Sequence, residues 1–148
     1  MRATYKHDHP WCKKGKQHAQ SPPLHLHFLQ SETFVVLSGE LGTTTTYSLV
    51  DTIHTPANTG ESNPHELKPW TPHTFWPSPD AAEDTVMMVW AHPEDVGDEK
   101  MDRLFFQNML MYVSDVSEGK EKLSLFQVML MQYVSPLSYF PAIFGTGP

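Results

Sequence analysis

Through the first two thirds of the chain, apolar residues come in short runs separated by turn-forming residues. This pattern predicts strands rather than helices. The runs are rich in β-branched and aromatic residues, and they predict strands at 24–28, 32–37, 41–50, 73–76 and 85–91. The last run is apolar at almost every position, so we expect both of its faces to be covered. Residues 55–64 consist of turn formers and predict a loop.

The pattern changes after residue 93. Apolar residues at helical spacing predict one helix over residues 100–113 and another over residues 123–134, which Pro136 ends. We therefore predict a β unit followed by a helical hairpin. The expected parts are an N-terminal arm that is irregular or holds one short strand (1–23), a β unit (24–93), a helical extension (100–135) and an irregular tail (136–148).

Length and composition narrow the class of protein. The 148 residues suffice for one domain with a hydrophobic core, and the thirteen prolines and eight glycines are typical of an all-β fold with many turns. A net charge of -7 without a basic stripe argues against a nucleic-acid partner. The single cysteine, Cys12, cannot form an intramolecular disulfide, and no apolar run follows Arg2. We therefore expect a cytoplasmic protein.

Three histidines and one glutamate form the candidate metal site. His25 and His27 would point to the same face of a strand. Glu32 opens the next predicted strand after a short turn, and His73 would come from a more distant strand. Imidazole and carboxylate ligands suit one divalent transition metal (Fe, Mn, Ni, Cu or Zn) better than calcium. Four protein ligands would leave two of six positions open to substrate or dioxygen; the alternative is histidines on partly exposed strands without a metal.

The spacing of these residues resembles two motifs of the cupin superfamily. The first motif is similar to His25-x-His27-x4-Glu32-x6-Gly39, and the second is similar to Pro72-His73-Thr74-Phe75. The resemblance covers residues 21–92. It implies a mainly β fold, the double-stranded β-helix or jelly-roll barrel, with a metal inside it bound by the four residues named above.

Aromatic and apolar residues near these motifs are candidates for a substrate pocket. Phe34 and Val36 alternate with Glu32, so they should face the same side of their strand. Phe75 and Trp90 are further candidates for contact with a planar substrate. Aromatic residues beside a barrel mouth are also ordinary core, and that alternative stays open for them.

The function expected from these features is that of a metal-dependent enzyme. We favour an oxidoreductase or dioxygenase, in which Glu32 remains a ligand or acts as a general base. The chain is also similar to short cupins with helical tails from fungal natural-product pathways, which implies a small aromatic or polyketide-like substrate from secondary metabolism. The alternatives are isomerase, cyclase or decarboxylase chemistry, or a binding module that catalyses no reaction.

The end of the chain bears on partners. Residues 123–148 contain no charged residue, but Pro136 and Pro141 break the run, which is therefore a poor membrane-spanning helix. We favour a helical lid over the barrel or a second subunit, and the alternative is contact with a membrane surface. Three apolar residues face away from the expected metal and favour a homodimer: Leu24, Leu26 and Phe28.

Overall fold

Two antiparallel sheets make up most of the described chain, in a computed structural model that describes residues 1–22, 24–92, 103–122, 124 and 127. The elements are, in order, β1 (Arg2–Tyr5), the 3-10 helix η1 (Cys12–Gln17), β2 (Ser31–Ser38), β3 (Leu41–Thr45), β4 (Val50–His54), β5 (His65–Leu67), β6 (His73–Pro77), β7 (Thr85–His92) and α1 (Arg103–Ser117). The mainly β prediction is confirmed.

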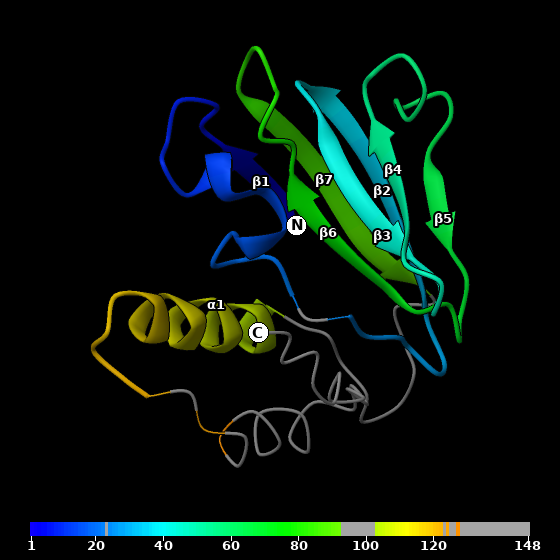
Figure 1. The fold of residues 1–148 in the computed structure, drawn as a ribbon. Helices are drawn as coiled ribbons and strands as arrows, with labels where there is room; N and C mark the ends of the chain where they lie inside the picture. The colour runs from blue at the N-terminus through cyan, green and yellow to red at the C-terminus, as the bar shows by residue number, and fades with distance from the viewer. Residues whose placement is uncertain (23, 93–102, 123, 125–126, 128–148) are drawn as a thin grey trace.

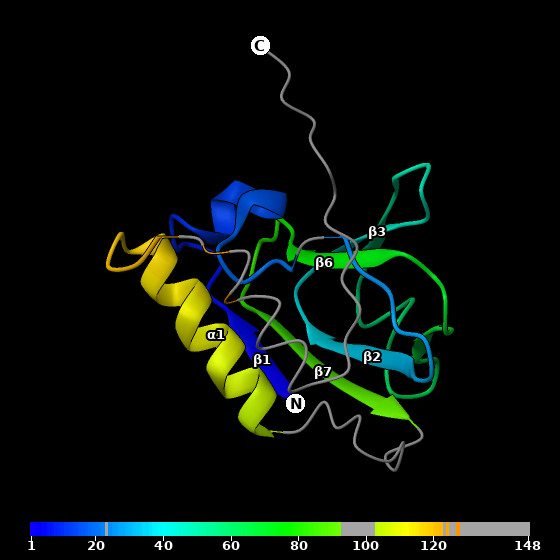
Figure 2. The same cartoon turned by 90° about the horizontal axis from the view of Figure 1, so that it is seen from below.

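The strands form a four-stranded sheet in the order β1-β7-β2-β5 and a three-stranded sheet in the order β4-β3-β6. The two sheets face one another, and their edge strands β4 and β5 lie on the same side (Figure 1). Figure 2 shows the same arrangement from below, with α1 outside the two layers. Closure of these sheets into a jelly-roll barrel stays a prediction.

The hydrophobic core lies between the sheets. Strand β2 supplies Phe34 and Val36, which are each 1% exposed, and β3 and β7 supply Leu41 and Met87, which are fully buried. Full burial of a side chain of this size stabilises the fold by roughly 1.5–3 kcal/mol. These contacts hold the two sheets together and fix which face of β2 points inward.

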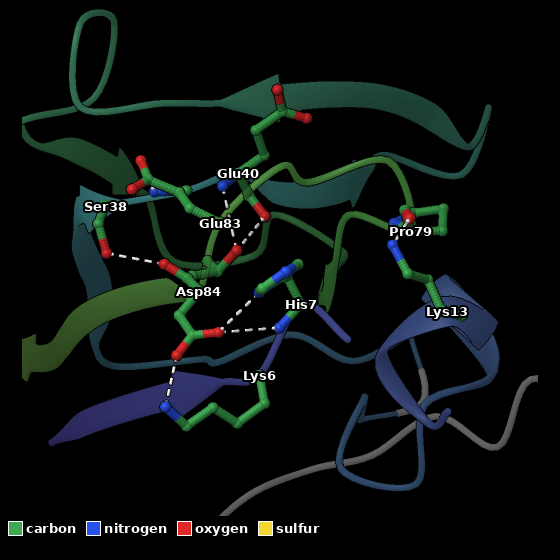
Figure 3. Close-up of polar contacts among 10 residues, drawn as sticks. Lys6, His7, Lys13, Ser38, Glu40, Pro79, Glu83 and Asp84 are labelled. Atoms are coloured by element: carbon green, nitrogen blue, oxygen red, sulfur yellow. Dashed lines mark hydrogen bonds and ion pairs between the residues drawn. The ribbon is translucent and has the colours of Figure 1, made fainter. Parts of the chain in front are cut away.

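The N-terminal arm contains the short strand that the sequence left as an alternative. Strand β1 pairs antiparallel with β7, and Tyr5 and Cys12 join the core. Just before β7, the Asp84 carboxylate accepts hydrogen bonds from the backbone N–H and the ring of His7, and it also pairs with Lys6 (Figure 3). These hydrogen bonds hold the pKa of Asp84 well below its usual range. The Asp84 contacts thereby fasten the arm at the C-terminal end of β1.

Several predicted element boundaries are wrong. Residues 24–28 form no strand beyond an isolated bridge between His25 and His73. The run 41–50 is broken by a turn, because Thr46 and Leu49 take positive φ angles of 64° and 55°. A new strand, β4, then begins at Val50. Strand β5 was not predicted.

The predicted burial of β7 on both faces is also wrong, because Met88 and Trp90 are 41% and 42% exposed on its outer face. Leu26 is only 3% exposed, so this chain itself covers one of the residues that favoured a homodimer. The homodimer stays a prediction.

The helix expected over 100–113 is confirmed as α1, while the one expected over 123–134 lies outside the described residues. Within the described residues, no helix has both the length and the apolar character needed to cross a membrane.

Gly42 permits a close contact that the sheet depends on. The indole of Trp76 lies across it, and a Cβ at this position would come 2.4 Å from three ring atoms. Trp76 Nε1 also donates a hydrogen bond to Thr44 Oγ1 at 3.1 Å, which fixes the ring in place. The ring therefore cannot move aside without losing a buried hydrogen bond.

We expect Gly42→Ala to lower the free energy of unfolding by about 1–3 kcal/mol, because overpacking displaces the indole. Urea denaturation of the purified protein measures this. The control is the same substitution in a Trp76→Leu background, where the added methyl group has room. An equal cost in both backgrounds would contradict the explanation.

Candidate metal centre

Four buried side chains converge between the two sheets. His25, His27, Glu32 and His73 each offer one ligand atom, and all four atoms lie within 4.8 Å of one another. The side chains are almost inaccessible to solvent, since the four residues are at most 7% exposed. The prediction that these residues meet is therefore confirmed.

Backbone hydrogen bonds bring the ligands together. His73 begins β6, and its N–H donates to the His25 carbonyl at 2.7 Å, while the His25 N–H donates to the His73 carbonyl at 3.0 Å. The His27 carbonyl accepts a hydrogen bond from the Trp70 N–H at 2.8 Å. Glu32 reaches the group from β2, in the other sheet. The segment around His25 and His27 thus needs no regular strand to hold both rings beside Glu32.

The hydrogen bonds leave an unbalanced group of acceptors at the centre. The Nδ1 atom of His73 lies 2.8 Å from the Thr71 carbonyl, so Nδ1 donates a hydrogen bond to that oxygen. The Nε2 atom then faces Glu32 Oε2 at 2.9 Å, and His27 Nε2 lies 3.2 Å from the same oxygen. Two acceptors at this distance repel unless a proton or a cation lies between them.

Glu32 is the negative charge of the group. Burial alone would raise its pKa, but the hydrogen bonds with His27 and His73 outweigh burial and hold the pKa well below its usual range. Glu32 is therefore a carboxylate at neutral pH. Because a buried anion is costly without a positive partner, the site favours a cation.

The geometry of the ligand atoms fits one transition-metal ion. Ligands about 2.1 Å from one ion lie about 3–4 Å apart, so small rotations of these side chains would close the observed group around it. Three imidazole nitrogens and one carboxylate oxygen are the ligand types that iron, manganese, nickel, copper and zinc accept. His73 Nδ1 donates a hydrogen bond to the Thr71 carbonyl. Metal-binding histidines usually make such a hydrogen bond with the ring nitrogen that does not bind the metal.

Three of the four predicted pocket residues point into the same interior. Phe34 and Val36 share a face of β2 with Glu32, and Phe75 packs against the core on β6. Trp90 does not, because it pairs with Thr33, which alternates with Glu32, and so it lies on the opposite face of the sheet. Its place among the pocket residues is a correction to the sequence prediction. In an all-apolar run nothing indicates which alternate residues point inward.

A second histidine pair lies in this interior, and sequence reasoning missed it. His54 ends β4 and His65 begins β5, and their ring centroids are 4.8 Å apart. Both rings contact Phe34, at centroid distances of 4.9 Å and 5.2 Å. His65 lies in a three-residue strand that no local pattern indicates, so only the fold reveals the pair.

Both histidines of this pair are neutral at neutral pH. Burial, together with the neighbouring His65, lowers the pKa of His54 to about 4, and burial also lowers the pKa of His65. The two ring nitrogens of His54 lie 2.8 Å from the hydroxyl oxygens of Thr43 and Thr59. Hydroxyl groups on both sides satisfy a neutral imidazole, because each can donate or accept.

Comparison with known proteins finds relatives that are named oxidoreductases or probable oxidoreductases. The chain is 32% identical over 137 residues to the probable oxidoreductase virH of Hypocrea virens, an alignment that covers 90% of this chain and 56% of that protein. It is 34% identical over 131 residues to the oxidoreductase iacF of Pestalotiopsis fici, covering 88% and 59%. The probable oxidoreductase yanE of Aspergillus niger is 33% identical over 128 residues, covering 82% and 48%.

The chain thus spans about half the length of these curated relatives. No protein-family model matches it. The relatives are named oxidoreductases, and this chain carries a buried group that could hold a metal.

The neutral state of His54 predicts a dependence of stability on pH. Its pKa is about 4 in the folded protein against 6.5 for an ordinary histidine. As the pH falls through this window the unfolded chain binds a proton that the folded chain does not, so stability is lost. The stabilisation that comes from the neutral His54 is fully present above about pH 6.5, the pKa of an ordinary histidine.

We expect His54→Gln to flatten this loss. Urea unfolding of chelator-treated protein, followed from about pH 7 to about pH 4, measures the slope. Wild type should lose more stability than the variant across that range, while His92→Gln, an exposed control, should match wild type. Parallel curves for wild type and His54→Gln would contradict a neutral buried His54.

Proposed function

We propose that this chain is a metal-dependent oxidoreductase of the cupin superfamily that acts on a small aromatic or polyketide-like metabolite. The observation that carries the proposal is the buried Glu32 carboxylate surrounded by three imidazoles. The motif spacing around His25 and His73, together with two facing antiparallel sheets, supports the assignment to the cupin superfamily.

A metal held by His25, His27, Glu32 and His73 would supply Lewis-acid or redox chemistry at positions that the protein leaves open. The chain's own residues prepare the site for it. The Thr71 carbonyl fixes the tautomer and the orientation of His73. Phe34 and Val36 exclude water from the adjoining interior, which strengthens electrostatic interactions there.

Glu32 is the residue that we propose as the proton acceptor. Its low pKa keeps it ionised, and it lies within hydrogen-bond distance of two rings that a substrate hydroxyl would approach. The names of the relatives favour oxidoreductase chemistry over isomerase, cyclase or decarboxylase chemistry. The substrate class rests on the similarity to cupins of natural-product pathways.

The first test is metal content. Elemental analysis of natively purified protein should find about one equivalent of a transition metal. His27→Ala should reduce this at least tenfold, because it removes one of four ligands. His92→Ala, which removes an imidazole outside the group, should retain the metal. The proposal would be wrong if the wild-type protein contains no transition metal as purified and takes up none on incubation with Fe(II), Mn(II) and Zn(II).

The second test separates an enzyme from a binding module. Oxygen uptake should rise when the metal-loaded protein is mixed with catechol- or flavonol-type compounds, and Glu32→Gln should abolish it. The unreacted compound bound to loaded protein, with no oxygen consumed and no product formed, would favour a module that only binds.

A further inference from the structure

Two side-chain contacts cross the space between the sheets, at neighbouring positions along β2. At the first, Glu32 of one sheet meets His73 of the other. At the second, Phe34 meets His54 of the other sheet. Glu32 and Phe34 are two residues apart and share the inner face, so the two contacts lie about 7 Å apart along the strand.

The strand pairing of β5 places His65 at the second of these positions. Leu67 pairs with Glu32, and His65 pairs with Phe34. Paired residues in an antiparallel sheet project from the same face, so His65 points to the side on which Glu32 meets the other ligands. The edge strands β5 and β4 lie on the same side of the two sheets (Figure 1), and the rings of His65 and His54 meet between them, with centroids 4.8 Å apart.

The two histidines differ in their hydrogen bonds. Both ring nitrogens of His54 are engaged by threonine hydroxyls, so this ring is fixed. The ring of His65 packs against Phe34 and His54, and its nitrogens have no hydrogen-bond partner within the described residues. The His65 side chain is half-buried, so a small molecule can reach it.

The charge of the pair indicates the kind of group that it would accept. Burial lowers the pKa values of both rings, so a ligand at neutral pH meets imidazole and not imidazolium. A neutral imidazole suits a hydroxyl, carbonyl or nitro oxygen, whereas a carboxylate would prefer a cationic partner.

We propose that His65 binds the substrate: its free ring nitrogen hydrogen-bonds an uncharged oxygen at the far end of an aromatic ring whose near oxygens reach the four-residue metal centre. His65 pairs with Phe34, which follows Glu32 on the same inner face of β2, so the two groups lie at neighbouring inward positions. His54 positions His65 by holding a fixed ring against it. This inference rests on the proposed metal centre and adds the substrate class and a specificity-determining residue to it.

The test uses two metal-chelating aromatic probes with the zinc-loaded protein. Catechol has only the two adjacent oxygens that would reach the metal, whereas 4-nitrocatechol adds an uncharged oxygen-bearing group at the far end of the ring. Absorbance or tryptophan-fluorescence titrations give Kd for each probe. The variants are His65→Phe, which keeps a flat ring without nitrogens, His65→Gln, which restores a hydrogen-bonding group, and His92→Phe as a control.

We expect His65→Phe to weaken 4-nitrocatechol binding about fivefold to tenfold, the usual effect of one hydrogen bond. Catechol binding should change less than twofold, His65→Gln should recover most of the loss, and zinc content should stay at the wild-type level. His92→Phe should affect neither probe. This selective loss is something that a merely structural role for His65 would not produce.

Every other outcome counts against the inference. Equal effects on both probes, no effect on either, or loss of zinc in both His65 variants would overturn the role of His65 while leaving the metal centre intact in wild type. Wild-type protein that takes up no zinc, or shows no change with catechol, would overturn the proposed function and this inference together.

Discussion

The structure depends on one buried carboxylate. Glu32 projects from β2 into the space between the sheets and meets His73 of the opposite sheet at 2.9 Å. A buried anion costs several kcal/mol unless a partner offsets it, so nothing in the hydrophobic core favours this residue by itself. Its position makes sense only with the imidazoles around it and a cation that they can share. The same side chain therefore links the two sheets and defines the functional site.

Strand β2 organises the interior because its alternation is unbroken on the inner face. Glu32, Phe34 and Val36 follow one another there, and each meets a different set of partners. The first meets the candidate metal-ligating histidines, the second meets the His54–His65 pair, and the third lies in the apolar core. The inner face of β2 thus becomes less polar from Glu32, at the candidate metal centre, to Val36, in the hydrophobic core. A one-residue slip of β2 would replace all three at once.

The sequence was sufficient where the information is local. The spacing from His25 to Gly39 indicated the candidate ligands and the motif glycine. Gly39 has a positive φ of 67° and no room for a Cβ beside Thr85, so this position requires glycine. Information that depends on distant partners was out of reach. The pairing of β1 joins Ala3 to Met87, and no pattern within residues 1–23 shows this. The face of Trp90 was equally hidden, because all its neighbours are apolar.

The loop before β6 shows how strain and ligation are connected. Trp70 is 65% exposed and takes a positive φ of 67°, which costs a residue other than glycine about 1 kcal/mol. Its N–H donates to the His27 carbonyl, and the carbonyl of the following residue, Thr71, accepts a hydrogen bond from the ring of His73. Two candidate ligands from separate segments are thus oriented by backbone groups of one short loop. An unfavourable backbone angle persists where the surroundings determine it strongly. Here these two hydrogen bonds do so, which makes the loop part of the candidate metal centre although it supplies none of the four candidate ligands.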